Sequence, residues 1–226
     1  GEADLAPVPV PHPGRMPAWA RPALLTSEAE RGPRRVGTLL AQVAAALEAL
    51  PADEVRWAQW QPLAWAWAEL TALRYVHHAE IDADQRAAYA RLRQRVDARF
   101  LPWLQERYAP LAGRTLPTPH HGHHVTAYLA YHYPPASGNR IALLILDGMA
   151  LADWVLIARA WRARHPDWHM EPQLVLAQVP TITPVARQAL VSGRHPADFV
   201  MLDNVLANTA SLRTSQAEPR LWARAW

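Results

Sequence analysis

The side chains best suited to chemistry follow two largely apolar runs in the second half of the chain. Residues 141–146 lead directly into Asp147, and residues 174–179 are followed by Thr183 and Arg187. Ligands of open α/β sheets bind outside the carboxyl ends of the strands. If the two runs are neighbouring parallel strands, we expect a carboxylate, a hydroxyl and a guanidinium group to meet at one edge of the sheet.

Asp147 has two interpretations at that edge. An ionised carboxylate at a strand end is a ligand that Zn²⁺, Mg²⁺ or Mn²⁺ requires. The same residue is also suited to capping a helix that begins near Leu151, because aspartate is a favoured N-cap residue. The pattern of a strand followed by Asp and Gly is compatible with both the metal-ligand and the capping interpretation.

Thr183 and Arg187 also have two interpretations each. Thr183 stands where a helix should start, with Pro184 at its first position, which is typical of an N-cap threonine. The chemical alternative is a nucleophile activated by a metal ion, whose phosphoryl adduct the helix N-terminal amides stabilise. Arg187 lies one turn further along the same face, where its guanidinium could hold a phosphate oxygen. Otherwise it is an ordinary surface arginine.

The elements that precede these residues are predicted to be helical. Prolines recur through residues 6–22, which indicates extended polyproline II structure in a first segment, residues 1–35. Apolar residues at helical spacing predict amphipathic helices at residues 36–50, 53–78 and 83–108, within a helical domain at residues 36–113. The second helix carries Trp57, Trp60, Trp65 and Trp67. We expect these indoles to pack in the core, the alternative being a binding platform for bases or sugars.

The remaining residues, 114–226, are predicted to form an α/β domain. Two apolar strands at 141–146 and 174–179 alternate with helices at about 151–164 and from 183 to about 190, after a short apolar segment at 125–131. Strand and helix in alternation indicate a parallel sheet covered on both faces. The predicted fold class is therefore α/β, with an N-terminal helical domain ahead of the sheet.

Composition restricts the class of protein. The chain of 226 residues is half apolar, carries a formal net charge of +3 and has no cysteine, which excludes disulfides and cysteine-based metal sites. No apolar run reaches the roughly 18–20 residues of a membrane span, and the start does not read as a signal peptide. We expect a cytoplasmic protein with no membrane partner. The arginines are spread without a dense basic block, so composition does not indicate direct nucleic-acid binding.

Residues 115–226 resemble the PglZ-type domain of bacterial phage-resistance systems, a branch of the alkaline phosphatase superfamily, with the type 3 BREX branch most similar. The resemblance rests on two main stretches: Leu146-Asp147-Gly148, and the run from Val179-Pro180-Thr181-Ile182-Thr183 through Arg187 to Gly193 and Pro196. Two further stretches support it: His123-His124 leading into Tyr128-Leu129-Ala130, and Ser211-Leu212-Arg213-Thr214 followed by Glu218-Pro219-Arg220-Leu221-Trp222. It implies an alkaline-phosphatase-like sheet, of which this chain would hold the first part.

The resemblance also implies a mechanism. Two divalent metal ions, zinc in the first place and manganese or magnesium otherwise, would hold the attacking and leaving oxygens of an in-line displacement. Asp147 is similar to the first metal ligand, and Thr183 matches the nucleophile position, where it would also touch metal. Asn204 falls where relatives place a phosphate-binding asparagine. The family's downstream Asp-x-x-x-His pair and Asp-His dipeptide are missing, so we expect the chain to be a fragment that is inactive by itself.

The cluster His120, His121, His123 and His124 is a second candidate metal site, because neutral imidazoles bind transition metals. Its proline-bounded loop offers no acidic partner, and its resemblance to the family's His-His element favours a structural role.

Two functions follow from these readings. The first is a metal-dependent phosphoester hydrolase with a threonine nucleophile, working with other BREX proteins and associating with DNA through their complex. The alternative is a non-catalytic scaffold that docks onto those proteins. The two differ in whether the missing metal ligands exist.

Overall fold

The computed structural model describes residues 28–113, 118–134, 138 and 140–201, and the chain divides into two units. The first comprises Gly1–Val96 with Leu151–Leu156, and the second comprises Asp97–Ala150 with Ile157–Trp226. The helical elements in chain order are α1 (Glu28–Glu48), α2 (Trp57–Val76), α3 (Ala83–Ala112), α4 (His124–His132), α5 (Leu151–Arg164), α6 (Thr183–Ser192) and the short 3₁₀ helix η4 (Pro196–Met201). Two of these helices, α3 and α5, contribute residues to both units.

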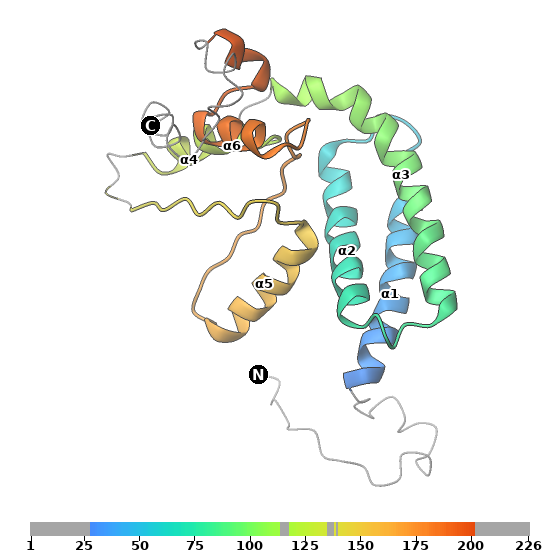
Figure 1. Cartoon of the computed structure of the whole chain (residues 1–226). Coiled ribbons are helices and arrows are strands. Elements are labelled where there is room, and N and C mark those ends of the chain that lie inside the picture. Colours follow the sequence, from blue (N-terminus) through green and yellow to red (C-terminus); the bar gives the residue numbers. More distant parts are fainter. Residues whose placement is uncertain (1–27, 114–117, 135–137, 139, 202–226) are drawn as a thin grey trace, which may run out of the picture. The chain divides into compact units, whose positions relative to one another are not determined.

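The first unit is built on the packing of α1 against α2, beside the first part of α3 (Figure 1). Apolar residues recur at three- and four-residue spacing along α1, where Val36, Leu39 and Val43 are almost completely buried. They face a similar stripe on α2 that includes Leu63 and Leu70. Burying aliphatic side chains of this size stabilises a fold by roughly 1.5–3 kcal/mol each, so these stripes hold the helices together.

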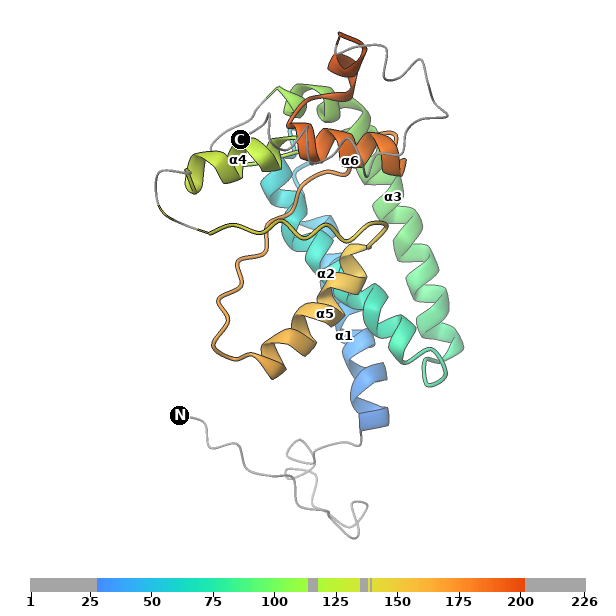
Figure 2. The ribbon, with the colours of Figure 1, turned by 60° about the vertical axis from the view of Figure 1, so that its left-hand side comes forward.

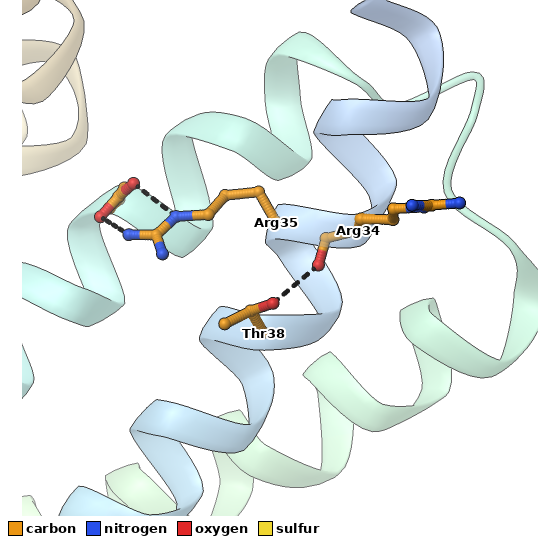
Figure 3. A network of polar contacts seen from close by, with 4 residues as sticks. Arg34, Arg35 and Thr38 are labelled. Atoms are coloured by element: carbon orange, nitrogen blue, oxygen red, sulfur yellow. Dashed lines mark hydrogen bonds and ion pairs between the residues drawn. The ribbon is translucent and has the colours of Figure 1, made fainter. Parts of the chain in front are cut away.

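Polar contacts set the register of this helical unit. The Arg35 guanidinium donates two hydrogen bonds to the Glu69 carboxylate at 3.0 and 2.9 Å, which joins α1 to α2 bidentately. On α1 itself the Thr38 hydroxyl donates to the Arg34 carbonyl (Figure 3). Arg95 on α3 pairs with Glu48 at the end of α1 at 2.9 Å. These pairs are exposed, so they specify the alignment of the helices more than they stabilise it.

The tryptophans of α2 pack against neighbouring groups. Trp60 is buried, and Trp57, Trp65 and Trp67 are half-buried. The indole of Trp67 stacks on the Tyr89 ring of α3 with ring centroids 5.0 Å apart. The prediction that these rings serve the core is confirmed.

The second unit contains α4 and α6, which lie side by side in both views (Figures 1 and 2). The Thr126 hydroxyl of α4 donates a hydrogen bond to the Leu190 carbonyl near the end of α6. Helix α6 then ends on Gly193, whose φ of 67° is left-handed and whose N–H bonds the Ala189 carbonyl at 3.0 Å. A side chain at that φ would be strained, which explains the glycine.

The predicted parallel sheet is not formed among the described residues. Residues 141–146 and 174–179 contain no strand, and Figure 1 draws both stretches as coil. The sole β-type pairing in the described part of the chain is an isolated parallel bridge between His121 and Leu176. A strand exists only when a neighbour satisfies its backbone groups, and no β-bridge joins these two runs. The part of the chain that the structure describes is thus mostly helical, and the parallel sheet of the predicted α/β class is not shown there.

The helices follow the predictions closely, with differences at their ends. Helix α5 spans the predicted residues, whereas α1 begins ahead of the expected residue 36, because residues 28–35 are helical without an apolar period. The apolar segment at 125–131 is the helix α4. The prolines of residues 6–22 lie outside the described residues. Within the described part of the chain, no helix combines the length and the apolar character needed to cross a membrane.

Candidate functional site

Asp147 lies in a tight turn between the extended run 141–146 and α5. The turn continues through Gly148, whose φ of 68° is left-handed and favours glycine. The first residue of α5 is Leu151, so the N-cap position belongs to Ala150 rather than to Asp147. The capping interpretation of Asp147 is therefore wrong, and its carboxylate is half-exposed and turned to another partner.

Thr183 is the first residue of α6. The extended φ and ψ of Ile182 make that residue the N-cap, and no side chain caps the helix. Pro184 lies within the first two helical positions, where its missing N–H costs nothing. Thr183 is exposed, and its hydroxyl makes no hydrogen bond within the described part of the chain. Thr183 is thus not the cap, and its hydroxyl lies beside the amides of a helix N-terminus.

The structure brings Arg187 and Asp147 together. The distance from Arg187 Nη1 to Asp147 Oδ2 is 3.6 Å, which makes an ion pair that is too long for a direct hydrogen bond. The side chains are 28% and 45% exposed. Because residues four apart share a helix face, Thr183 lies one turn before Arg187 on α6. We refer to Asp147, Thr183 and Arg187 as the turn–helix site.

The turn–helix site has the groups that bind an oxyanion. A guanidinium group and helix N-terminal amides both favour a phosphate or a carboxylate. Asn204, the fourth predicted site residue, lies outside the described residues. Asp147 meets Arg187 of α6 because a turn meets a helix, and not because two strands pair. The roles of Asp147, Thr183 and Arg187 at a common site stay predictions.

The described residues do not fit a two-metal centre as they stand. No group of three or more histidine, aspartate or glutamate side chains within the described ranges could hold a metal ion. The turn–helix site supplies one carboxylate, and Arg187 already neutralises it. A divalent metal in a protein usually takes three or more protein ligands, or fewer when substrate phosphates complete its shell. We therefore derive no chemical step through a metal from these residues.

Side chains of the histidine cluster form hydrogen bonds with the C-terminal end of α3 within the second unit. His124 Nδ1 accepts hydrogen bonds from the backbone N–H groups of His120 and His121 at 3.1 and 3.3 Å, so its proton is on Nε2. That Nε2–H donates to the Ala112 carbonyl at 2.8 Å, and His123 Nε2 donates to the same oxygen at 3.3 Å. The last carbonyls of a helix have no partner inside it. The cluster supplies these partners, which supports the structural role predicted for it.

Burial keeps these imidazoles neutral. It lowers the pKa of His121 to about 4, with a further lowering by the neighbouring His123 and His124. The pKa values of His123 and His124 are also lowered, again mainly by burial. His121 Nε2 donates to the Tyr108 carbonyl at 3.1 Å. The free energy that an imidazolium loses on leaving water exceeds the stabilisation that it would gain from the negative end of the helix dipole.

Tyr108, near the end of α3, is a residue that the sequence reasoning missed. Its hydroxyl accepts the Val179 N–H at 2.7 Å and donates to the Ala177 carbonyl at 3.0 Å. The Tyr108 phenol thus makes hydrogen bonds with the backbone at the end of the run 174–179 that a neighbouring strand would otherwise make. Burial raises the pKa of Tyr108, although the hydrogen bond from Val179 opposes this effect. A single tyrosine at helical spacing carries no signal of such a role.

Comparison with known proteins gives one match. Residues 135–226 match the model of the BREX system PglZ alkaline phosphatase-like domain. The matched region contains the turn–helix site. No curated protein and no solved structure matches the chain.

Proposed function

We propose that this chain contributes to the hydrolysis of phosphate esters in a BREX phage-defence system, with Thr183 as the nucleophile. The observation that carries the proposal is the convergence of Asp147 and Arg187 at 3.6 Å, with Thr183 one turn away on α6. The PglZ match over residues 135–226 supports it, because all three residues lie inside that region.

The roles follow from the chemistry of each group. Thr183 Oγ would form the new bond to phosphorus as the bond to the leaving ester oxygen breaks, and water would then release the phosphate. Arg187 would hold two phosphate oxygens, and the first amides of α6 would stabilise the developing charge. Asn204 would add a further hydrogen bond to the phosphate.

The proposal includes two divalent metal ions, zinc or alternatively manganese or magnesium, with Asp147 and Thr183 among their ligands. Their remaining ligands would come from outside the described residues, because the described ones supply a single carboxylate at the site, that of Asp147, which is paired with Arg187. Other BREX proteins are the expected partners, and DNA would be reached through their complex.

Hydrolysis of p-nitrophenyl phosphate and of bis-p-nitrophenyl phosphate by the native protein, with Zn²⁺ or Mn²⁺ added, tests this function. We expect turnover of at least one ester and a loss of about 100-fold or more in Asp147→Asn. The matched change Asp167→Asn, at an exposed carboxylate beyond α5, should leave turnover unchanged. Equal turnover by the Asp147→Asn protein would remove Asp147 from the site.

A specific observation favours a second function, that of a non-catalytic scaffold. Ile141, Leu144 and Leu146 are exposed on a run that pairs with no strand in the described part of the chain. Such a run is suited to strand addition by another protein. Absence of turnover on both esters, together with binding of the chain to other BREX proteins, would favour this function.

A further inference from the structure

Trp168, just beyond the end of α5, is the one exposed tryptophan among the residues that the structure describes. It is 50% exposed, whereas the other described tryptophans are buried or half-buried. Its indole stacks on the His165 imidazole, with ring centroids 4.1 Å apart and ring planes at 10° to one another. Trp161, in the last turn of α5, meets the same indole edge to face at 6.0 Å. We refer to Trp161, His165 and Trp168 as the α5 ring cluster.

Backbone hydrogen bonds hold the α5 ring cluster in its arrangement. The His165 N–H donates to the Trp161 carbonyl at 2.7 Å, and the Trp168 N–H donates to the His165 carbonyl at 3.1 Å. The imidazole covers part of the indole, yet Trp168 stays 50% exposed. A further flat ring can therefore stack on this cluster, because offset-stacked aromatic pairs are favourable.

Two arginines bring positive charge to the cluster. Arg162 and Arg164 lie in the last turn of α5, and both are exposed. Arg164 follows Trp161 by three residues, a separation that makes side chains neighbours on a helix. Arg162 precedes His165 by the same number of residues. Both guanidinium groups can therefore reach an anion that binds beside the rings.

The negative charge near the cluster is smaller. Over residues 159–171, three arginines stand against two carboxylates, those of Asp167 and Glu171. His169 Nε2 lies 2.8 Å from the Glu171 carboxylate, so that carboxylate already has a partner. An anion that binds beside the rings therefore meets more positive than negative charge.

We propose that the α5 ring cluster binds single-stranded nucleic acid, with a base stacked on Trp168 and phosphates held by Arg162 and Arg164. Each base offers a flat ring, and each phosphate offers the charge that a guanidinium group binds. Stacking on aromatic side chains tolerates any base, so this surface would bind without base-specific contacts. The proposal goes beyond the hydrolysis proposed above, because it concerns a different surface and a direct contact between this chain and nucleic acid.

The chemistry of the surface favours this occupant over two others. A duplex keeps its bases stacked on one another, so it would meet the arginines and leave the rings unused. An acidic peptide would likewise bind the arginines through its carboxylates alone. A single strand engages the rings and the arginines together.

Fluorescence anisotropy of a labelled single strand of about 16 nucleotides measures this binding. The full chain is titrated in EDTA, so that no metal-dependent cleavage of the strand interferes. We expect Trp168→Ala to weaken binding by about fivefold or more, the scale of one lost base stack, and Trp168→Phe to retain most of the affinity. Tyr75→Ala, which removes another exposed ring from α2, should leave the affinity unchanged.

The arginines are tested through the salt dependence of the same binding. The double change Arg162→Gln and Arg164→Gln should lower the slope of log affinity against log salt by roughly 1.4, about 0.7 for each phosphate contact. The matched pair Arg34→Gln and Arg91→Gln, at exposed positions of α1 and α3, should leave the slope unchanged. An unchanged slope in the first pair would overturn the phosphate contacts.

Equal affinity of Trp168→Ala and the unaltered protein overturns the proposal, and so does equal binding of the strand and its duplex. Absence of binding overturns it as well and leaves another protein as the occupant of the surface. If Trp168→Ala does not fold, photocross-linking of the unaltered protein to a strand that carries iododeoxyuridine decides instead. Cross-links to Trp161, His165 or Trp168 support the proposal, and cross-links confined to other residues contradict it.

Discussion

At the scale of single residues, two sets of described side chains differ in burial: His121, His123 and His124 are buried, whereas Asp147 and Arg187 are partly exposed. The pKa values of the three histidines are lowered, mainly by burial, and their rings bond to backbone carbonyls at the end of α3. Asp147 and Arg187 form an ion pair whose side chains are 45% and 28% exposed. Burial is the main cause of the difference, because removing an imidazolium from water costs free energy that the partly exposed ion pair does not lose.

The buried histidines predict a loss of stability in mild acid. Because the pKa of folded His121 is about 4 and its ordinary value is 6.5, the unfolded chain binds the proton first as the pH falls. The stabilisation is complete above about pH 7 and declines between about pH 6.5 and pH 4. We expect the free energy of unfolding, measured by urea denaturation, to be about 1–2 kcal/mol lower at pH 5 than at pH 7.5.

A histidine variant identifies the source of that loss. His121→Gln should reduce the difference between pH 7.5 and pH 5, whereas His169→Gln, at an exposed position, should leave it as it is. The same pH dependence in all three proteins would assign the effect to other groups.

At the scale of the elements, the sequence pattern predicts helices better than strands. Apolar residues at helical spacing located α2, α3 and α5 to within a few residues, because a helix satisfies its backbone within its own segment. The apolar runs at 141–146 and 174–179 have the composition of buried strands, yet Leu144 is 73% exposed. Whether such a run becomes a strand depends on a neighbour elsewhere in the chain, which local composition does not report.

The end of the run 174–179 depends instead on one hydroxyl. We predict that Tyr108→Phe, which removes the partner of the Val179 N–H and the Ala177 carbonyl, lowers stability by about 1 kcal/mol. Hydrogen exchange of the Val179 amide should become faster than in the unaltered protein.

A matched tyrosine provides the control. Tyr131→Phe removes a hydroxyl from a side chain that is 66% exposed, and it should change neither quantity. Unchanged exchange at Val179 in the Tyr108→Phe protein would show that the phenol does not hold this segment.

At the scale of the whole molecule, the chain combines a helical unit that has a buried apolar core with a second unit that has little β-pairing. Among the described residues of that unit, the run 141–146 makes no β-bridge and the run 174–179 makes an isolated one at Leu176. The expectation that Asp147, Thr183 and Arg187 belong to one site could be drawn from the sequence, since each follows an apolar run at a spacing typical of a ligand-binding edge. The ion pair between Asp147 and Arg187 could not be predicted from the sequence, because the two residues are 40 positions apart and meet only in the folded chain. The family match spans the same part of the chain, residues 135–226.

The most direct test of the central claim compares the two threonines of the stretch Thr181-Ile182-Thr183 in the ester hydrolysis assay. The account predicts that Thr183→Ala loses about 100-fold or more of the turnover, that Thr183→Ser retains a measurable part of it, and that Thr181→Ala is unaffected. Turnover by Thr183→Ala equal to that of the unaltered protein, with the fold intact by circular dichroism, would contradict it.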